Sequence, residues 1–254
     1  MKSNVKIALA VIALGILLSV TVAANKVYHK PKDTKAEIAG LAKVKKIKPL
    51  TVNSAVPKIL DFIENSRHSW TSIYVEGYSQ AGTNPVNKFR AWVKRSGVYR
   101  LEEGHVIHIK NNKERWIITP PAKRAVFFEV VQPPKDKEEG LNKVIDTPLN
   151  DLINPSYFVR KELRQNAETV ENIGITKIAG RSAIHLKVTF PKKTAKENYW
   201  DIYVDCKTGI ILGRVIHPPA GNPEVKDFID KVEINPMINP NMFTFVPPVG
   251  YKIN

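Results

Sequence analysis

The chain has 254 residues, of which 43% are hydrophobic, and a formal net charge of +15. This length and composition allow a hydrophobic core in one large or two small globular domains. The single cysteine, Cys206, excludes an intramolecular disulfide, and it lies too far from the N-terminus to be the lipid-bearing cysteine of a bacterial lipoprotein signal.

The first 24 residues form either a retained signal anchor or a cleaved signal peptide. Lys2 and Lys6 precede a weakly polar or apolar run, residues 7–24, which as a helix is about 27 Å long and close to the thickness of the hydrocarbon layer. This length favours an anchor, whereas Val22, Ala23 and Ala24 also fit the small-residue rule for cleavage. We expect a single anchor at the cell membrane, or a secreted protein if the signal is cleaved.

The segment that follows is strongly basic. Residues 25–50 contain eight lysines against Asp33 and Glu37, and they include two prolines. This composition is typical of a solvated linker. We therefore interpret residues 51–254, which keep a net charge of +7, as the folded domain.

A helix and then six strands are predicted for the first part of this domain. Ser54 suits a helix N-cap, and the helix is expected to end near His68, after which apolar residues recur at every second position. Strands are predicted at residues 70–80, 87–95, 97–102, 105–111, 114–120 and 124–131. Their connections are short, which indicates an antiparallel meander.

Two helices and then further strands are predicted for the second part. Asp146 suits the cap of the first helix, and Pro155 suits the first position of the second. Strands are predicted at residues 181–190, 198–206, 210–216, 224–235 and 241–246. The first two of these alternate cleanly, with an apolar face made by Ile184, Leu186, Val188, Trp200, Ile202 and Val204. Such alternation indicates one covered face and one wet face.

These elements predict an α+β fold. A sheet of about 11 strands cannot stay flat, so we expect a strongly curved antiparallel sheet that forms an open half-barrel wrapped around the helices and is preceded by the N-terminal apolar helix. The six apolar residues of the alternating strands then line the concave side, with Trp116 and Phe128 as neighbours. They enclose either an open apolar cavity, closed by helices near residues 147–166, or a dry and full core.

The sequence contains no catalytic or metal-binding motif. His105 and His108 are three residues apart on a predicted strand, so their side chains point to opposite faces. His185 lies on the polar side of its strand, which is typical of a solvated side chain, and Cys206 on an apolar side, which is typical of a small buried residue. We therefore expect no enzyme, no metal and no cofactor.

A basic stripe lies on one face of the strand at residues 87–95. Lys88, Arg90 and Lys94 share this face with Trp92. The pattern fits contact with nucleic acid or an anionic surface, and it equally fits the ordinary wet face of a sheet. Export of the domain removes nucleic acid as a partner.

Three segments together resemble the LolA-like lipoprotein-carrier superfamily. They are GVYRLEEGHVIHIKNNKERWIITPPAKRAVFF, YVDCKTGIILGRVI and VEINPMINPNMFTFVPPVGYKI, in this order. The superfamily includes the periplasmic lipoprotein carrier, its outer-membrane receptor and the sensor domain of the sigma-factor regulator RseB. The resemblance covers about residues 54–254 and rests on the order of the motifs, one of which is Asp-x-x-Thr-Gly at residues 205–209.

This resemblance implies a curved antiparallel sheet around helices, with an apolar hollow that in the carrier holds lipoprotein acyl chains. It also implies an extracytoplasmic domain, which the positive-inside rule alone does not favour because lysines follow the apolar run. Arg100 matches the strand arginine that helps to latch the helical lid in carriers. The chain departs from the family in having Asn111 and Asn112 where members often have Asp-Gly, and in its long basic linker.

Two functions follow. The first is a membrane-tethered binding module without enzymatic activity, whose hollow takes lipid or lipoprotein acyl chains. The second is an RseB-like regulatory or envelope domain that binds a partner protein and has a filled core. An open apolar hollow favours the first, and a packed concave side favours the second.

Overall fold

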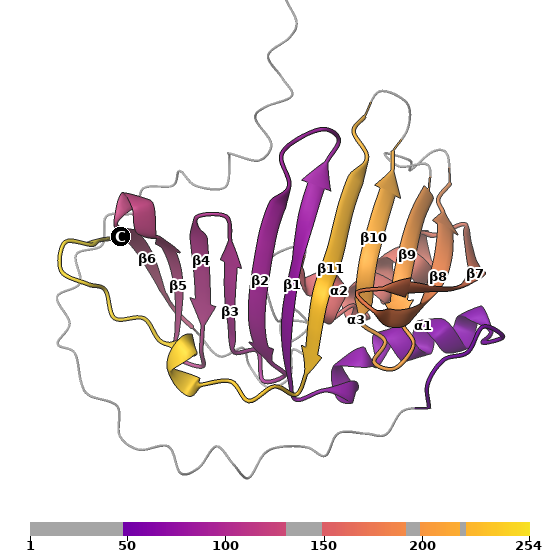
Figure 1. Ribbon diagram of the computed structural model, residues 1–254, viewed down its shortest axis with the longest axis horizontal. Helices are drawn as coiled ribbons and strands as arrows, with labels where there is room; N and C mark the ends of the chain where they lie inside the picture. The colour runs from indigo at the N-terminus through magenta and orange to yellow at the C-terminus, as the bar shows by residue number, and fades with distance from the viewer. Residues whose placement is uncertain (1–47, 131–148, 192–198, 219–221) are drawn as a thin grey trace, which may run out of the picture. The chain divides into compact units, whose positions relative to one another are not determined.

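The computed structural model describes residues 48–130, 149–191, 199–218 and 222–254, all of which lie in one compact unit, residues 42–254. Twelve strands form one open sheet in the order β12-β6-β5-β4-β3-β2-β1-β11-β10-β9-β8-β7 (Figure 1). No helix within the described ranges is long and apolar enough to cross a membrane. The predicted anchor, the N-terminal apolar helix and residues 25–47 of the predicted linker lie outside these ranges. Leu50, the last residue of that linker, is buried in the main core.

The first half of the sheet is the predicted meander. Its strands pair antiparallel in sequence order, and the turn between the last two contains the short helix η3, Pro120–Ala122. The strands are β1 (Ser72–Ala81), β2 (Asn87–Lys94), β3 (Tyr99–Glu103), β4 (Val106–Lys110), β5 (Glu114–Thr119) and β6 (Arg124–Glu129). All six predicted strands are confirmed, with bounds that differ by a few residues.

The second half contains one strand that the sequence analysis missed. Its strands are β7 (Thr169–Ile178), β8 (Arg181–Thr189), β9 (Tyr199–Asp205), β10 (Ile211–His217) and β11 (Val225–Ile234). Strand β7 is the missed one, because a bulge between Asn172 and Gly174 interrupts its alternation and because it lies at the edge of the sheet. Strand β11 pairs with β1 and joins the two halves.

Short helices pack on one face of the sheet, which we call the inner face. They are α1 (Val56–Glu64), η2 (Ser66–Ser69), α2 (Leu149–Ile153), α3 (Ser156–Phe158) and the π-helix η5 (Val159–Asn166). Ile59 and Ile63 of α1, Leu152 of α2 and Val159 of η5 are buried in the main core. The predicted cap by Ser54 is wrong: Ala55 precedes the helix, and the Ser54 hydroxyl accepts a hydrogen bond from the Thr51 amide instead. Asp146, the other predicted cap, lies outside the described residues.

The C-terminal segment differs from its prediction as a closing strand at residues 241–246. Residues 240–243 form the short helix η6 (Pro240–Phe243), and the next residues are extended without a ladder. The ring nitrogens of Pro247 and Pro248 carry no hydrogen to donate to a sheet. The chain instead adds β12 (Lys252–Ile253) parallel to β6, so the sheet is mixed and has twelve strands. The predicted α+β half-barrel is otherwise confirmed.

Candidate binding site on the inner face of the sheet

The helix-covered part of the inner face is densely packed. The six residues predicted to line the concave side, Ile184, Leu186, Val188, Trp200, Ile202 and Val204, are between 0% and 7% exposed and belong to the main core. The Trp200 ring stacks on Phe158 of α3 at a centroid distance of 5.7 Å and meets Phe190 at 4.4 Å. Between these strands and the helices, described side chains fill the space.

One small cavity adjoins this core. Its volume is about 30 Å³, and its lining consists of Ser79, Phe89, Leu101, Glu103, Leu149, Leu152 and Asp227. One water molecule occupies about 30 Å³ in the liquid. The cavity is therefore far too small for an acyl chain.

A row of polar side chains crosses the inner face beside this cavity. Arg214 of β10 donates from Nε and Nη2 to Asp227 Oδ2 of β11, at 3.2 and 2.8 Å, and Ser79 of β1 donates to the other oxygen of Asp227. Asn87 of β2 donates to Glu103 Oε1 of β3 at 2.6 Å. The row therefore spans five neighbouring strands, in one group on β10, β11 and β1 and another on β2 and β3. No local sequence pattern predicts this row, because its members lie far apart in the chain.

Burial raises the pKa of Glu103, and the negative charge of the nearby Asp227 raises it further. The hydrogen bond from Asn87 lowers the pKa but does not cancel the rise. Asp227 is itself neutralised by Arg214, which is 8% exposed and also lies 3.7 Å from Asp151 of α2. This end of the helix-covered face is thus polar but internally paired.

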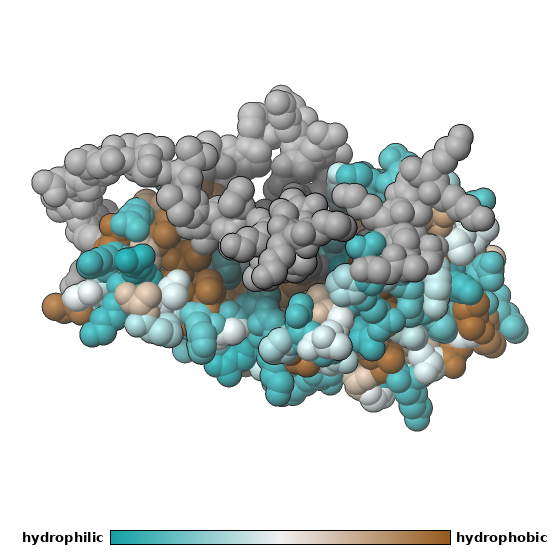
Figure 2. Space-filling model, turned by 90° about the horizontal axis from the view of Figure 1, so that it is seen from above, coloured by the Kyte–Doolittle hydropathy of each residue, from teal (hydrophilic) through white to brown (hydrophobic). Residues whose placement is uncertain are grey.

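The inner face of β4–β6 is different, because none of the helices α1, α2, α3 and η5 lies over it in Figure 1. Parity along the paired strands places Ile117, Val126 and Phe128 on this face. Ile117 and Val126 are half-buried, and Phe128 is 44% exposed. Arg115 holds its guanidinium 5.6 Å from the centre of the Phe128 ring. Figure 2 shows hydrophobic residues gathered on the side of the molecule that holds these strands, at the left of the view.

Basic residues accompany the apolar ones on this surface. Lys110, Arg115 and Arg124 share its parity with Ile117, Val126 and Phe128. No carboxylate of β4, β5 or β6 takes this parity, since Glu114 and Glu129 face the other way. The surface is thus suited to an apolar ligand that carries negative charge. We call these six residues the inner apolar-basic surface.

Arg100 and Trp116 do not share the inner face with the other predicted binding residues. Arg100 is opposite Ile109 in the β3–β4 ladder, whereas Leu101 of the inner face is opposite His108. Trp116 is opposite Ile109 in the next ladder, so both lie on the outer face. Arg100 donates to Glu102 at 2.7 Å, and Trp116 belongs to a second buried cluster with Ile109, Ile118 and Ala125. A binding role for the nine predicted residues stays a prediction.

The basic stripe lies on the outer face of β2. Arg90 forms an ion pair with Glu102 and lies 5.6 Å above the Trp92 ring, and the Lys94 ammonium lies 5.1 Å from the Phe243 ring. Although burial raises the pKa of Glu102, hydrogen bonds from Arg100 and Arg90 hold it below its usual value. Part of the charge of the stripe is therefore neutralised within the sheet.

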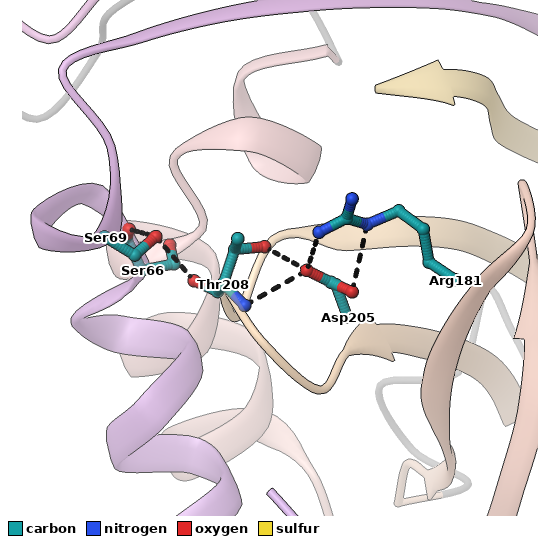
Figure 3. Close-up of polar contacts among 5 residues, drawn as sticks. All are labelled: Ser66, Ser69, Arg181, Asp205 and Thr208. Atoms are coloured by element: carbon teal, nitrogen blue, oxygen red, sulfur yellow. Dashed lines mark hydrogen bonds and ion pairs between the residues drawn. The ribbon is translucent and has the colours of Figure 1, made fainter. Parts of the chain in front are cut away.

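The Asp-x-x-Thr-Gly motif has a structural role (Figure 3). The Asp205 carboxylate is buried and accepts hydrogen bonds from Arg181 at 3.1 and 2.8 Å and from the Thr208 amide at 3.0 Å. The Thr208 carbonyl in turn lies 2.9 Å from the hydroxyl of Ser69. Gly209 has φ of 76°, and a side chain there would lie 2.7 Å from the Phe62 carbonyl oxygen. The motif therefore holds the β9–β10 turn against α1 and η2.

A histidine–carboxylate group lies on the outer face of β8–β10. His185 and His217 both direct Nε2 at Asp201, at 2.6 and 2.8 Å, and Nδ1 of His217 lies 2.9 Å from Glu224. His185 is thus paired rather than simply solvated. Within the described ranges, no three side chains of His, Cys, Asp or Glu are grouped so that they could hold a metal ion.

These features agree with the expected fold. An open, curved sheet wraps around helices on its inner face, which is the architecture that the resemblance to the LolA-like superfamily implies. No family model matches the sequence, and no curated protein sequence is significantly similar to it.

Solved structures are similar to this chain. An uncharacterized conserved protein from Thermus thermophilus aligns with a TM-score of 0.47 and 10% identity, over 79% of this chain and 99% of that one. A chain of the MucA/MucB complex of Pseudomonas aeruginosa aligns with a TM-score of 0.48 and 14% identity, over 74% of this chain and 60% of that one. A LolA superfamily protein from Nitrosomonas europaea aligns with a TM-score of 0.29 and 9% identity, over 76% of this chain and 98% of that one. At these values the likenesses say nothing about a ligand or partner.

Proposed function

We propose that this chain is a membrane-tethered, extracytoplasmic binding module without enzymatic activity, and that the inner apolar-basic surface binds lipid or lipoprotein acyl chains. The tether is the apolar run at residues 7–24. The observation that carries the binding site is the 44% exposed ring of Phe128, which lies beside Ile117, Val126 and Arg115 on a face that none of α1, α2, α3 and η5 covers.

The site differs from the hollow expected from the sequence. The strands β8 and β9 supply a filled core, so an acyl chain has to lie along β4–β6. Apolar side chains there supply the contact area, and Arg115 and Lys110 suit the negative charge of a lipid head group.

A second candidate is a domain that binds a partner protein. The filled core favours it, because the cavity that adjoins the core between the sheet and α2 holds only about 30 Å³. A partner that contacts the surface of the sheet needs no hollow.

The test uses two neighbouring phenylalanines on opposite faces of β6. Phe127 and Phe128 are 42% and 44% exposed, and Phe127 lies on the outer face against Trp116. Phe128→Gln should weaken uptake of a fluorescent acyl probe about tenfold, because a polar amide replaces apolar contact area. Phe127→Gln is the control and should leave uptake unchanged.

Mass spectrometry of lipid that co-purifies with the full chain gives an independent measurement. A folded protein that takes up no probe and carries no lipid contradicts the acyl proposal and leaves the partner-protein candidate. The tether is tested separately by adding protease to intact, wall-stripped cells. A domain that stays protected there is not extracytoplasmic.

A further inference from the structure

Three side chains that can donate hydrogen bonds lie in a row at one end of the inner apolar-basic surface. Arg124 of β6 is opposite Thr119 of β5 in the antiparallel ladder and is in register with Lys252 of β12 in the parallel one. Residues paired across strands in this way point to the same face of a sheet. Because Arg124 is on the inner face, Thr119 and Lys252 are there too. The row lies at the edge of the sheet, beside the C-terminal end of the chain (Figure 1).

Neither Arg124 nor Lys252 is neutralised by the described residues around it. Both are exposed, and neither has an ion pair or a side-chain hydrogen bond within the described ranges. Every other arginine in these ranges has an interaction partner; Arg90, for example, pairs with Glu102. Arg124 and Lys252, which we call the edge cation pair, are therefore available to an anion from outside.

No acidic side chain of the surrounding strands lies beside the edge cation pair. The strands β4, β5, β6 and β12 contain no Asp, and their two glutamates, Glu114 and Glu129, are on the outer face. The inner-face carboxylate of β3, Glu103, is three strands from Arg124, roughly 14 Å at the usual strand spacing. The backbone oxygen of Asn254 is bonded to an amide of β6 within the plane of the sheet. This end of the inner face therefore attracts anions.

An apolar strip begins next to the edge cation pair. Ile117 and Val126 are opposite each other, two residues along the ladder from Arg124, which is roughly 7 Å. Phe128 follows after two more residues of β6, and the Arg115 guanidinium already lies against its ring. The surface thus has a cationic end at the edge of the sheet and an apolar length behind it. This order suits an amphiphile whose charged head group stays near water.

We propose that the ligand of the inner apolar-basic surface is an anionic phospholipid, with its phosphate at Arg124 and Lys252 and an acyl chain over Val126 and Phe128. The inference rests on the proposed function and names the ligand within it. A guanidinium binds phosphate through two parallel hydrogen bonds, and an ammonium adds a point charge. The acyl chains of a lipoprotein are attached through neutral ester and amide linkages, which leave the two cations without a partner.

The test compares lipids that differ only in their head groups. The full chain in a neutral detergent is titrated with fluorescent phosphatidylglycerol, phosphatidylcholine and diacylglycerol that share the same acyl chains. Their head groups are respectively anionic, zwitterionic and free of phosphate. The edge variant combines Arg124→Gln with Lys252→Gln. The control variant combines Lys177→Gln with Lys207→Gln, which removes the same charge from two exposed positions in the other half of the sheet.

The unaltered chain should bind phosphatidylglycerol about tenfold more tightly than diacylglycerol, with phosphatidylcholine between them, because hydrogen bonds between charged groups are strong. The edge variant should bind all three lipids with the affinity for diacylglycerol, whereas the control variant should keep the preference. Both variants retain the N-terminal segment and lose equal charge, so neither the basic linker nor the net charge can produce this difference. Thermal unfolding of the edge variant should stay unchanged, since both side chains are exposed.

Phe128→Gln separates this inference from the function on which it rests. It should weaken the binding of phosphatidylglycerol and diacylglycerol by the same factor, because it removes apolar contact that both lipids make. If the folded chain binds no lipid at all, the proposed function fails and the phospholipid with it.

Three other results overturn the anionic phospholipid and leave acyl binding standing. The first is equal affinity of the unaltered chain for the three lipids, and the second is an equal effect of the two charge variants. The third is loss of the preference in Lys110→Gln but not in the edge variant, which moves the phosphate to the other end of the surface.

Discussion

The two ends of the sheet bury their apolar residues on opposite faces. From β7 to β2, helices cover the inner face and form a core with Ile59, Trp70, Leu152 and Ile202. Around β4–β6, the buried cluster is on the outer face, where Ile109, Trp116, Ile118 and Ala125 meet Phe245 and Tyr251 of the C-terminal segment, residues 235–254, which we call the strap. The first end is a packed scaffold, and the second leaves an inner surface that none of the helices α1, α2, α3 and η5 covers.

The difference shows how one continuous sheet can combine stability with an available face. A strand needs apolar cover on only one side. Where helices supply this apolar cover on the inner face, that face is no longer accessible. Where the strap supplies it on the outer face, Phe128 and its neighbours stay accessible on the inner one.

The largest expected effect is at the helix-covered end. Leu186→Ala should reduce the free energy of unfolding by about 2–5 kcal/mol, because Leu186 is fully buried in a filled core and its truncation leaves a void. Denaturant titration measures this loss. Ile173→Ala on the exposed edge strand is the control and should change stability by less than about 0.5 kcal/mol. A loss near the control value at position 186 means that the core around it is loosely packed.

The buried carboxylate of the Asp-x-x-Thr-Gly motif comes next. Asp205→Ala should cost about 2–3 kcal/mol, less than the usual 3–5 kcal/mol or so for breaking a fully buried ion pair, because Arg181 is 25% exposed and regains water. Asp61, whose side chain is 69% exposed in its pair with Arg164, is the control, and Asp61→Ala should have little effect. Similar losses in the two variants contradict a structural role for the motif.

A smaller and local effect is expected at the strap. Phe245→Ala should cost about 1 kcal/mol, since the ring is only half-buried, and should release the strap without unfolding the helical core. Hydrogen exchange should accelerate at the amides of Phe127 and Asn254, which bond across β6 and the segment beside it. The amide of Cys206, which donates to Ser182, is the internal control. Equal acceleration at Cys206 means that the two ends unfold together.

Two adjacent glutamates should respond to pH with opposite signs. The pKa of Glu103 on the inner face is raised by burial, so its stabilising contribution is complete below the unfolded pKa and is lost as the pH rises through the folded pKa. Glu103→Gln should therefore raise Tm at pH 7 by a few degrees at most, with the gain vanishing near pH 4. Glu102 on the outer face has a lowered pKa, and Glu102→Gln should lower Tm at pH 7 and lose its effect in acid. Thermal scans across this range measure both, and effects of one sign contradict the assignment.

The smallest effect is expected for the basic stripe. Replacing Lys88, Arg90 and Lys94 by Gln should change stability by about 0.5 kcal/mol at most, since all three are on the outer face and partly exposed. Association with anionic vesicles should weaken modestly, and its dependence on salt should flatten. If neither affinity nor salt dependence changes in a vesicle titration, the stripe is only a solvated face.

Local pattern alone predicted most of the elements. Alternation along residues 181–190 and 198–206 assigned the six core residues to one covered face, because the period of two is a property of the strand itself. The same reasoning predicted the meander. It missed β7, where the bulge before Gly174 breaks the alternation.

The sequence by itself therefore determined most of the strands and the apolar side of those that alternate cleanly. Only the tertiary structure decided which apolar side faces the helices. Each turn sets a new register, and a shift of one residue moves a whole strand to the other face. Trp116 and Phe128 were for this reason expected together and lie on opposite faces. Two other features also depend on residues that lie far apart in the chain. They are the polar row from Arg214 to Glu103 and the cover supplied by the strap, and no local sequence pattern predicts such contacts.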